Sequence, residues 1–161
     1  MAIVAIDANV LVGLLDERDK WHGTAIDLRD ALDKADAELV YLDCVLNEVI
    51  SVLARRTHEQ RRPEQLDALL DQLATLVPVR DITWISGEIK RLYDQVVELV
   101  RDSAGALNFH DALIALMCRE WAIAVLVSFD QDFDQVGWLT RAGSAAEVVM
   151  TLQQNPNGSA S

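Results

Sequence analysis

Short runs of apolar, β-branched residues constrain this fold most. Residues 2–6 (AIVAI) and 122–127 (AIAVLV) are apolar throughout, and residues 38–42 (ELVYL) are nearly so. A run that is apolar on both sides predicts a strand buried on both faces of its sheet. Residues 76–79 (LVPV) are a further candidate strand, and we expect it at a sheet edge because Pro78 has no amide hydrogen to donate.

The segments between these runs carry apolar residues at helical spacing. We expect helices just after Asp7, over 22–35, over 44–56, from Pro63 onward, over 84–101 and over 108–121. Short apolar strands that alternate with helices predict an α/β fold with a parallel sheet covered on both faces. We expect one domain, residues 1–152, followed by a disordered polar tail, residues 153–161.

The net charge of −12 argues against a general nucleic-acid coat protein, which is normally basic. It does not exclude an enzyme that reaches nucleic acid through bound metal. No apolar run is long enough to span a bilayer, and no basic residue precedes the N-terminal apolar run, so we expect a cytoplasmic protein. Cys44 and Cys118 match no metal-binding spacing and are predicted to be buried free thiols.

Four carboxylates stand against apolar runs, where a charge is costly unless something compensates it: Asp7, Glu48, Asp111 and Asp130. Asp7 and Asp130 each follow a predicted strand, and in a parallel sheet the strand ends of one rim form the site. Each could instead cap a helix, because an aspartate accepts hydrogen bonds from free helix amides. A divalent cation held by all four would compensate their charges together.

Two of these carboxylates lie in predicted helices. Glu48 is at the margin of an apolar helix face, where a solvated glutamate is the ordinary interpretation. Asp111 lies in a helix that is apolar nearly all round, so an ionised side chain there would be strongly desolvated. A site role is the stronger hypothesis for Asp111, and capping of its own helix is the alternative. Asp132 extends the acidic cluster around Asp130.

Residues 55–62 (RRTHEQRR) are the densest positive charge in the chain. The four arginines are Arg55, Arg56, Arg61 and Arg62. They are either a solvated helix end, favourable near the negative end of the helix dipole, or contacts for RNA or a protein partner.

The chain resembles the PIN-domain nucleases, and most closely the VapC-type ribonuclease toxins of toxin–antitoxin systems. The matching pieces are IDANVLV, NEVISVLARR, FHDALIAL and SFDQDFDQV, in family order between residues 3 and 136. The resemblance implies a three-layer α/β/α sandwich. It also implies that Asp7, Glu48, Asp111 and Asp130 bind Mg²⁺ or Mn²⁺, with Asn9 and Ser128 as hydrogen-bonding supports and Asp132 as a less certain member.

The resemblance further implies a metal-dependent endoribonuclease that hydrolyses phosphodiester bonds of RNA, forms a homodimer and is inhibited by a small antitoxin protein. Two alternatives stay open on the sequence. One is a non-catalytic PIN-like RNA-binding or regulatory module. The other is a metal-dependent phosphohydrolase of another α/β fold.

Overall fold

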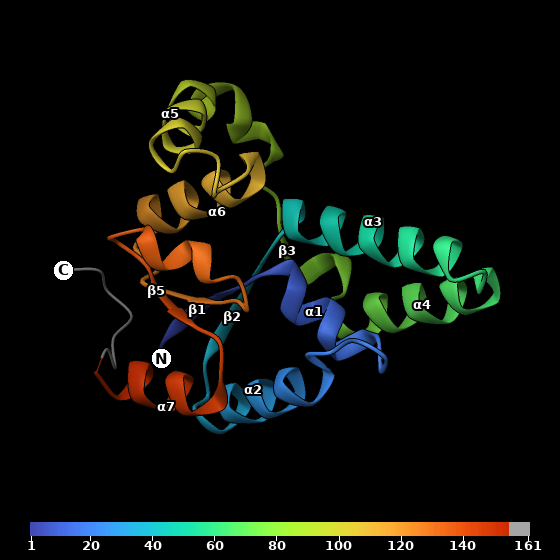
Figure 1. The fold of residues 1–161 in the computed structure, drawn as a ribbon. Helices are drawn as coiled ribbons and strands as arrows, with labels where there is room; N and C mark the ends of the chain where they lie inside the picture. The colour runs from blue at the N-terminus through green and yellow to red at the C-terminus, as the bar shows by residue number, and fades with distance from the viewer. Residues whose placement is uncertain (155–161) are drawn as a thin grey trace.

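A central sheet of five parallel strands organises the chain, as seen in a computed structural model that describes residues 1–154 (Figure 1). The strands are β1 (Ile3–Ile6), β2 (Glu38–Leu42), β3 (Ile82–Thr83), β4 (Val125–Val127) and β5 (Thr140–Ala142). Their order in the sheet is β3-β2-β1-β4-β5, and each neighbouring pair is parallel. The first strand therefore lies at the centre, where the sequence predicts full burial.

Helices cover both faces of this sheet. They are α1 (Ala8–Leu15), α2 (His22–Lys34), α3 (Asp43–Glu59), α4 (Leu66–Leu76), α5 (Ile89–Asp102), α6 (Phe109–Glu120) and α7 (Ala145–Gln154). Helices α5 and α6 pack together on one side of the strands, and α2 and α7 pack together on the other (Figure 1). The predicted three-layer α/β/α sandwich with a parallel sheet is confirmed.

Helix α6 is the most deeply buried helix, as its sequence predicts. Every residue from Asp111 to Cys118 is buried, and the helix packs beneath α5. Both cysteines are buried and free, in agreement with the prediction. Helices α3 and α4 form a pair that extends sideways beyond the sheet (Figure 1).

The third strand was predicted at the wrong residues. Residues 76–79 end a helix instead, since the amide of Val77 donates to the carbonyl of Leu73 at 2.8 Å. Pro78 then leads into a short 3₁₀ helix, Val79–Asp81, and the edge strand β3 follows it. Pro78 does precede an edge strand, but that strand is only two residues long and shows no periodicity in the sequence.

The last strand and helix were also missed. Strand β5 (TRA) is short and has only one buried residue, so it lacks an apolar pattern. Helix α7 ends at Gln154, so the predicted polar tail of residues 153–161 begins inside this helix, and its remainder lies outside the described residues. Within the described part of the chain, no helix is long and apolar enough to cross a membrane.

Candidate active site

Asp7 and Ser128 meet at the carboxyl edge of the sheet because they follow two neighbouring central strands. Ile6 pairs with Val127, and each strand ends at that pair. The amide of Asp7 donates to the carbonyl of Val127 at 3.0 Å. The Ser128 hydroxyl, which is fully buried, donates to Oδ2 of Asp7 at 2.6 Å.

Asn9 ties the two strand ends together. Its Nδ2 donates to Asp7 Oδ2 at 3.1 Å and lies 3.2 Å from the Ser128 hydroxyl oxygen. Its Oδ1 accepts from the amide of Phe129 at 3.1 Å. The Ser128 hydroxyl oxygen also accepts from the amide of Asp130 at 3.0 Å. The segments 7–9 and 128–130 thus form one hydrogen-bonded unit.

Asp7 is a buried carboxylate that faces other carboxylates. Only 5% of the residue is exposed, and Oδ1 accepts from the amide of Ala8, at the start of α1. Burial raises the pKa of Asp7 to about 7, against the lowering effect of its hydrogen bonds from Ser128 and Ala8. The negative charges of Asp111 and Glu48 raise it further. Asp7 therefore combines capping of α1 with a position in an acidic cluster.

Asp111 caps its own helix, which is one of the two roles that the sequence left open. Its Oδ2 accepts from the amide of Asn108 at 2.9 Å, and the Asn108 side chain accepts from the Asp111 amide, which is a capping box for α6. Burial raises the pKa of the Asp111 carboxyl, and the charges of Asp130 and Glu48 raise it further. The cap fixes the side chain at the first turn, where it faces the other acids.

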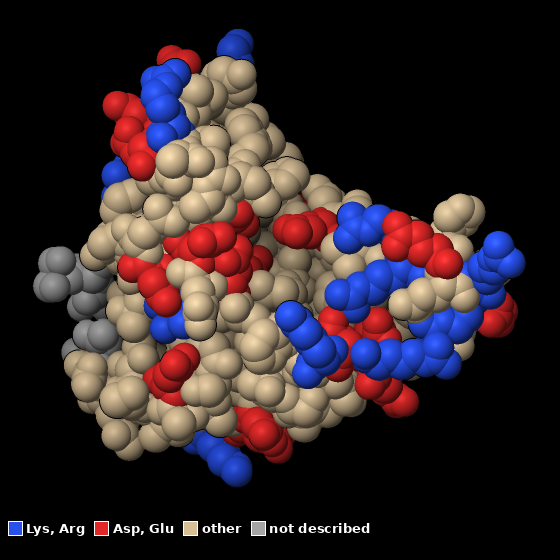
Figure 2. Space-filling model, in the orientation of Figure 1, with Lys and Arg blue, Asp and Glu red and all other residues tan. Residues whose placement is uncertain are grey.

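The remaining acidic residues are less enclosed. Glu48 is half-buried on α3, at the predicted margin of the apolar face. Asp130 is half-buried and caps the 3₁₀ helix Gln131–Gln135 by accepting from the amide of Asp132 at 2.9 Å. Asp132 itself is exposed. Figure 2 shows one group of acidic side chains near the middle of this face, beside others that are scattered over it.

The acidic residues do not form a closed ion-binding site as placed. Among residues 1–154, no group of three or more His, Cys, Asp or Glu side chains is arranged to hold a metal ion. The donor set nevertheless suits a hard divalent cation, because it consists of carboxylate oxygens without histidine or cysteine. The charge of Asp111 raises the pKa of Asp7, and the charges of Asp130 and Glu48 raise that of Asp111, so a cation bound near these carboxylates would offset their repulsion.

The four arginines of the predicted cluster have different surroundings. Arg56 forms ion pairs with Asp16 at 3.1 Å and Asp19 at 2.6 Å, so its charge is neutralised within the protein. Arg62 donates to Gln65 at 2.7 Å. Arg55, within α3, and Arg61, between α3 and α4, are both exposed. Figure 2 shows basic side chains concentrated on the α3–α4 arm.

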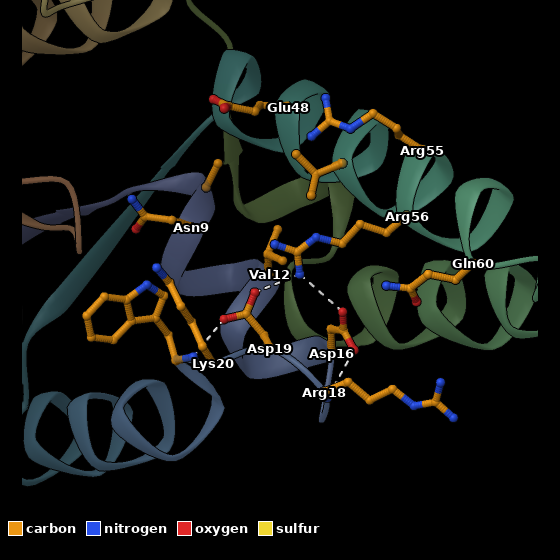
Figure 3. Close-up of a pocket in the computed structure, with 13 residues that line it drawn as sticks. Asn9, Val12, Asp16, Arg18, Asp19, Lys20, Glu48, Arg55, Arg56 and Gln60 are labelled. Carbon is orange, nitrogen blue, oxygen red and sulfur yellow. Dashed lines mark hydrogen bonds and ion pairs between the residues drawn. The ribbon is translucent and has the colours of Figure 1, made fainter.

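A cavity of about 410 Å³ joins this basic arm to the acidic edge. Asn9 and Glu48 line it on the acidic side, and Arg55 and Arg56 line it along α3 (Figure 3). The loop between α1 and α2 closes the other side.

Sequence reasoning missed two residues that stabilise this edge. Arg141 on β5 donates from Nε to Asp134 at 2.7 Å and from Nη1 to the carbonyl of Ser128 at 3.1 Å. Asp43, which follows β2, is 2% exposed and accepts from the amides of Ile85 and Ser86 at 3.0 and 3.1 Å. Asp43 could have been found as another aspartate that follows a strand, whereas nothing in the sequence around Arg141 indicates its role.

Comparison with known proteins agrees with this architecture. The family model described as PIN domain matches residues 4–139. A chain from the crystal structure of VapBC2 from Rickettsia felis bound to a DNA fragment from their promoter matches with a TM-score of 0.60 at 17% identity. This match covers 87% of the present chain and 97% of that chain. At this identity the match establishes a shared fold. No curated protein sequence matches the chain.

Proposed function

The chain belongs to the PIN-domain family, and on that premise we propose that it is a divalent-metal-dependent endoribonuclease of the VapC toxin type. The observation that carries the proposal is Asp7, a buried carboxylate that faces Asp111 and Glu48 and whose pKa is raised to about 7. A perturbed carboxylate at the carboxyl edge of a parallel sheet is typical of a functional site. Membership of this family removes the alternative of a phosphohydrolase on another α/β fold.

PIN-domain nucleases generally use divalent metal ions, and the acidic residues here supply suitable donors. We assign Asp7 and Asp111 as the primary ligands of Mg²⁺ or Mn²⁺, with Glu48 and Asp130 completing the site. When bound, such an ion supplies positive charge against the scissile phosphate and lowers the pKa of water. Asp132 is exposed and is a weaker candidate.

The supporting residues hold the acidic oxygens in place before substrate arrives. Ser128 and Asn9 both donate to Oδ2 of Asp7, which restricts the rotation of that carboxylate. Asn108 does the same for Oδ2 of Asp111 through its backbone amide. A site built this way reorganises little when charge develops on the substrate, and that is the main source of electrostatic catalysis.

The proposed substrate is single-stranded or looped RNA, because an exposed phosphate backbone can enter an open acidic edge. Arg55, Arg61 and Arg62 are proposed contacts for RNA or for an antitoxin, while Arg56 is engaged with Asp16 and Asp19. The similar chain comes from a VapBC2 complex, which supports an antitoxin partner for this chain as well. A homodimer and a cytoplasmic location complete the proposal.

RNA cleavage with Mg²⁺ or Mn²⁺, with and without excess chelator, tests this function directly. We expect cleavage that the chelator abolishes and that Asp7→Asn loses. Asp94→Asn is a matched control, since Asp94 is an exposed aspartate on α5. Cleavage that persists in chelator, or that survives in Asp7→Asn, would contradict the proposal. Metal-independent RNA binding without cleavage would instead favour the non-catalytic PIN-like module.

A further inference from the structure

An aromatic pair borders the acidic edge of the sheet. The rings of Trp21 and Phe129 stack with their centroids 4.7 Å apart and an interplanar angle of 13°. Phe129 is half-buried, whereas Trp21 is 36% exposed and lines the 410 Å³ cavity. One face of the indole is therefore fixed by Phe129.

This pair is attached to the site itself. Phe129 lies between Ser128 and Asp130, and its amide donates to Asn9 Oδ1 at 3.1 Å. The amide of Trp21 donates to the side chain of Asp19 at 2.8 Å, and Asp19 is held in turn by Arg56. The indole is thus anchored from both neighbouring loops, so its position relative to the acidic residues is defined.

Cationic side chains line the same cavity together with the carboxylates of Asp16, Asp19 and Glu48. Lys20 places its Nζ 5.2 Å from the centre of the Trp21 ring. Arg18 and Arg55 also line the cavity, with Glu48 at its acidic end (Figure 3). The volume falls in the range of small-ligand pockets, roughly 300–1,000 Å³. The cavity thus offers an aromatic surface and positive charges in the same lining as Glu48.

From these contacts we propose that Trp21 is a stacking platform for one unpaired nucleobase of the RNA, next to the phosphate at the acidic edge. The incoming base displaces the ammonium of Lys20 from the indole, and Lys20 and Arg55 then contact the flanking phosphates. This inference rests on the proposed function, since it assumes an RNA strand at the site. It goes further in assigning a specificity-determining residue and an unpaired nucleotide as its ligand.

The platform selects single strands for a physical reason. Every base has a π-face that can stack on an aromatic side chain, but in a duplex both faces are already covered by neighbouring bases. An unpaired base is free to leave its neighbours. Stacking of this kind changes affinity by about fivefold to a hundredfold per base.

Binding of fluorescein-labelled single-stranded oligouridylate, measured by anisotropy in the presence of chelator, separates this proposal from cleavage. We expect Trp21→Leu to weaken binding at least about fivefold and Trp21→Phe to retain most of the affinity. Trp84→Leu is the control, because Trp84 is 65% exposed and lies outside the cavity. The matching duplex should compete poorly with the single strand.

A scan with single abasic nucleotides then identifies stacking. In the wild-type protein, one abasic position should weaken binding about as much as Trp21→Leu does, and the same position should have little further effect in Trp21→Leu. If Trp21→Leu lost as much affinity for the abasic strand as for the intact strand, the platform would be overturned. The absence of RNA binding would overturn it as well. Cleavage that Trp21→Leu leaves unchanged in KM and in strand preference would overturn it while the proposed nuclease stands. Base-dependent binding without cleavage would support the platform and refute the nuclease.

Discussion

Asp7 and Asp43 are two buried aspartates that follow neighbouring strands, yet their surroundings differ completely. Each comes directly after its strand, β1 or β2, and starts or caps the next helix. The carboxylate of Asp43 accepts from the backbone amides of Ile85 and Ser86, so two neutral donors satisfy it. Asp7 faces Asp111 and Glu48, whose charges add to the effect of burial. Burial at a strand end therefore does not by itself distinguish a structural aspartate from a candidate site residue, and the groups around the carboxylate have to be considered as well.

The largest expected difference between the two is in activity. Asp7→Asn should reduce RNA cleavage at least about a thousandfold, because it removes a proposed metal ligand from the reacting centre. Asp43→Asn, assayed below its melting temperature, should keep kcat within about threefold, since the Asp43 carboxylate is engaged by the backbone amides of Ile85 and Ser86. Cleavage rates at saturating RNA decide the matter. Equal losses of cleavage rate in both variants would contradict the functional difference between Asp7 and Asp43.

The pH dependence of stability should differ between the Asp7 and Asp43 variants. The pKa of Asp7 is about 7 in the folded chain against an ordinary value of 3.8, so the folded state favours the protonated carboxyl. Its stabilising contribution is fully present below the unfolded pKa and is lost as pH rises through about 7. This shift corresponds to roughly 4 kcal/mol.

Urea unfolding in chelator, measured between about pH 5 and pH 8, checks this expectation. The free energy of unfolding should decrease with rising pH in the wild type and in Asp43→Asn. It should change much less in Asp7→Asn, which should also be the more stable protein at the upper end of the range. Identical slopes in all three proteins would mean that Asp7 does not titrate in this window.

Loss of the Asp43 carboxylate should produce the next largest effect. Asp43→Ala leaves the amides of Ile85 and Ser86 without their acceptor, and that of Ile85 is in a fully buried residue. We expect the free energy of unfolding to fall by about 2–4 kcal/mol. Asp94→Ala, at an exposed site on α5, should change it by less than about 0.5 kcal/mol. A decrease of less than about 1 kcal/mol in the free energy of unfolding of Asp43→Ala would contradict a structural role for Asp43.

Stabilisation by metal should depend on the acidic residues around Asp7 and should not depend on Asp43. Mg²⁺ or Mn²⁺ at about a hundred times its dissociation constant should stabilise the folded chain by about 2.7 kcal/mol. Combined Asn or Gln substitution of Asp7, Glu48, Asp111 and Asp130 should abolish the rise in melting temperature, while Asp43→Asn should retain it. An equal rise in the wild type and the fourfold variant would show that the ions bind elsewhere.

The smallest effects belong to the basic arm, which lies away from both aspartates. Gln at Arg55, Arg61 and Arg62 should weaken RNA or antitoxin binding and flatten its salt dependence, since fewer contacts release fewer counterions. Turnover at saturating RNA should change little. Arg56→Gln should act differently, because it breaks ion pairs with Asp16 and Asp19 and should lower stability by about 1 kcal/mol. Salt titrations and unfolding curves distinguish the two variants.

The sequence predicts the centre of this molecule better than its periphery. Strands β1 and β4 and the stretch Ala112–Cys118 of α6 are almost entirely buried and apolar, so the sequence indicates them directly. Strands β3 and β5 are short edge strands with few buried residues, and their pairing depends on neighbours distant in sequence. The periodicity of the sequence does not indicate such pairing.

The candidate site divides in the same way. Asp7 and Asp130 could be placed because each follows a strongly apolar strand, and Asn9 and Ser128 came only through the family resemblance. The division of the arginines could not be predicted, since Arg56 pairs with acids of the α1–α2 loop at separations of 40 and 37 residues. Arg141 was missed for the same reason, as its contacts depend on the position of β5 in the sheet.

The position of β1 between β2 and β4 determines when the acidic edge can assemble during translation. Asp7 leaves the ribosome 121 positions before Ser128, and the buttressing Arg141 comes later still. A nascent chain that has emerged only as far as β3 therefore holds Asp7 and Glu48 without Asp111, Asp130 or their supports. The acidic edge cannot assemble until Ser128 and Asp130 have emerged, so any chemistry at this edge is withheld while the segments that precede β4 are being translated.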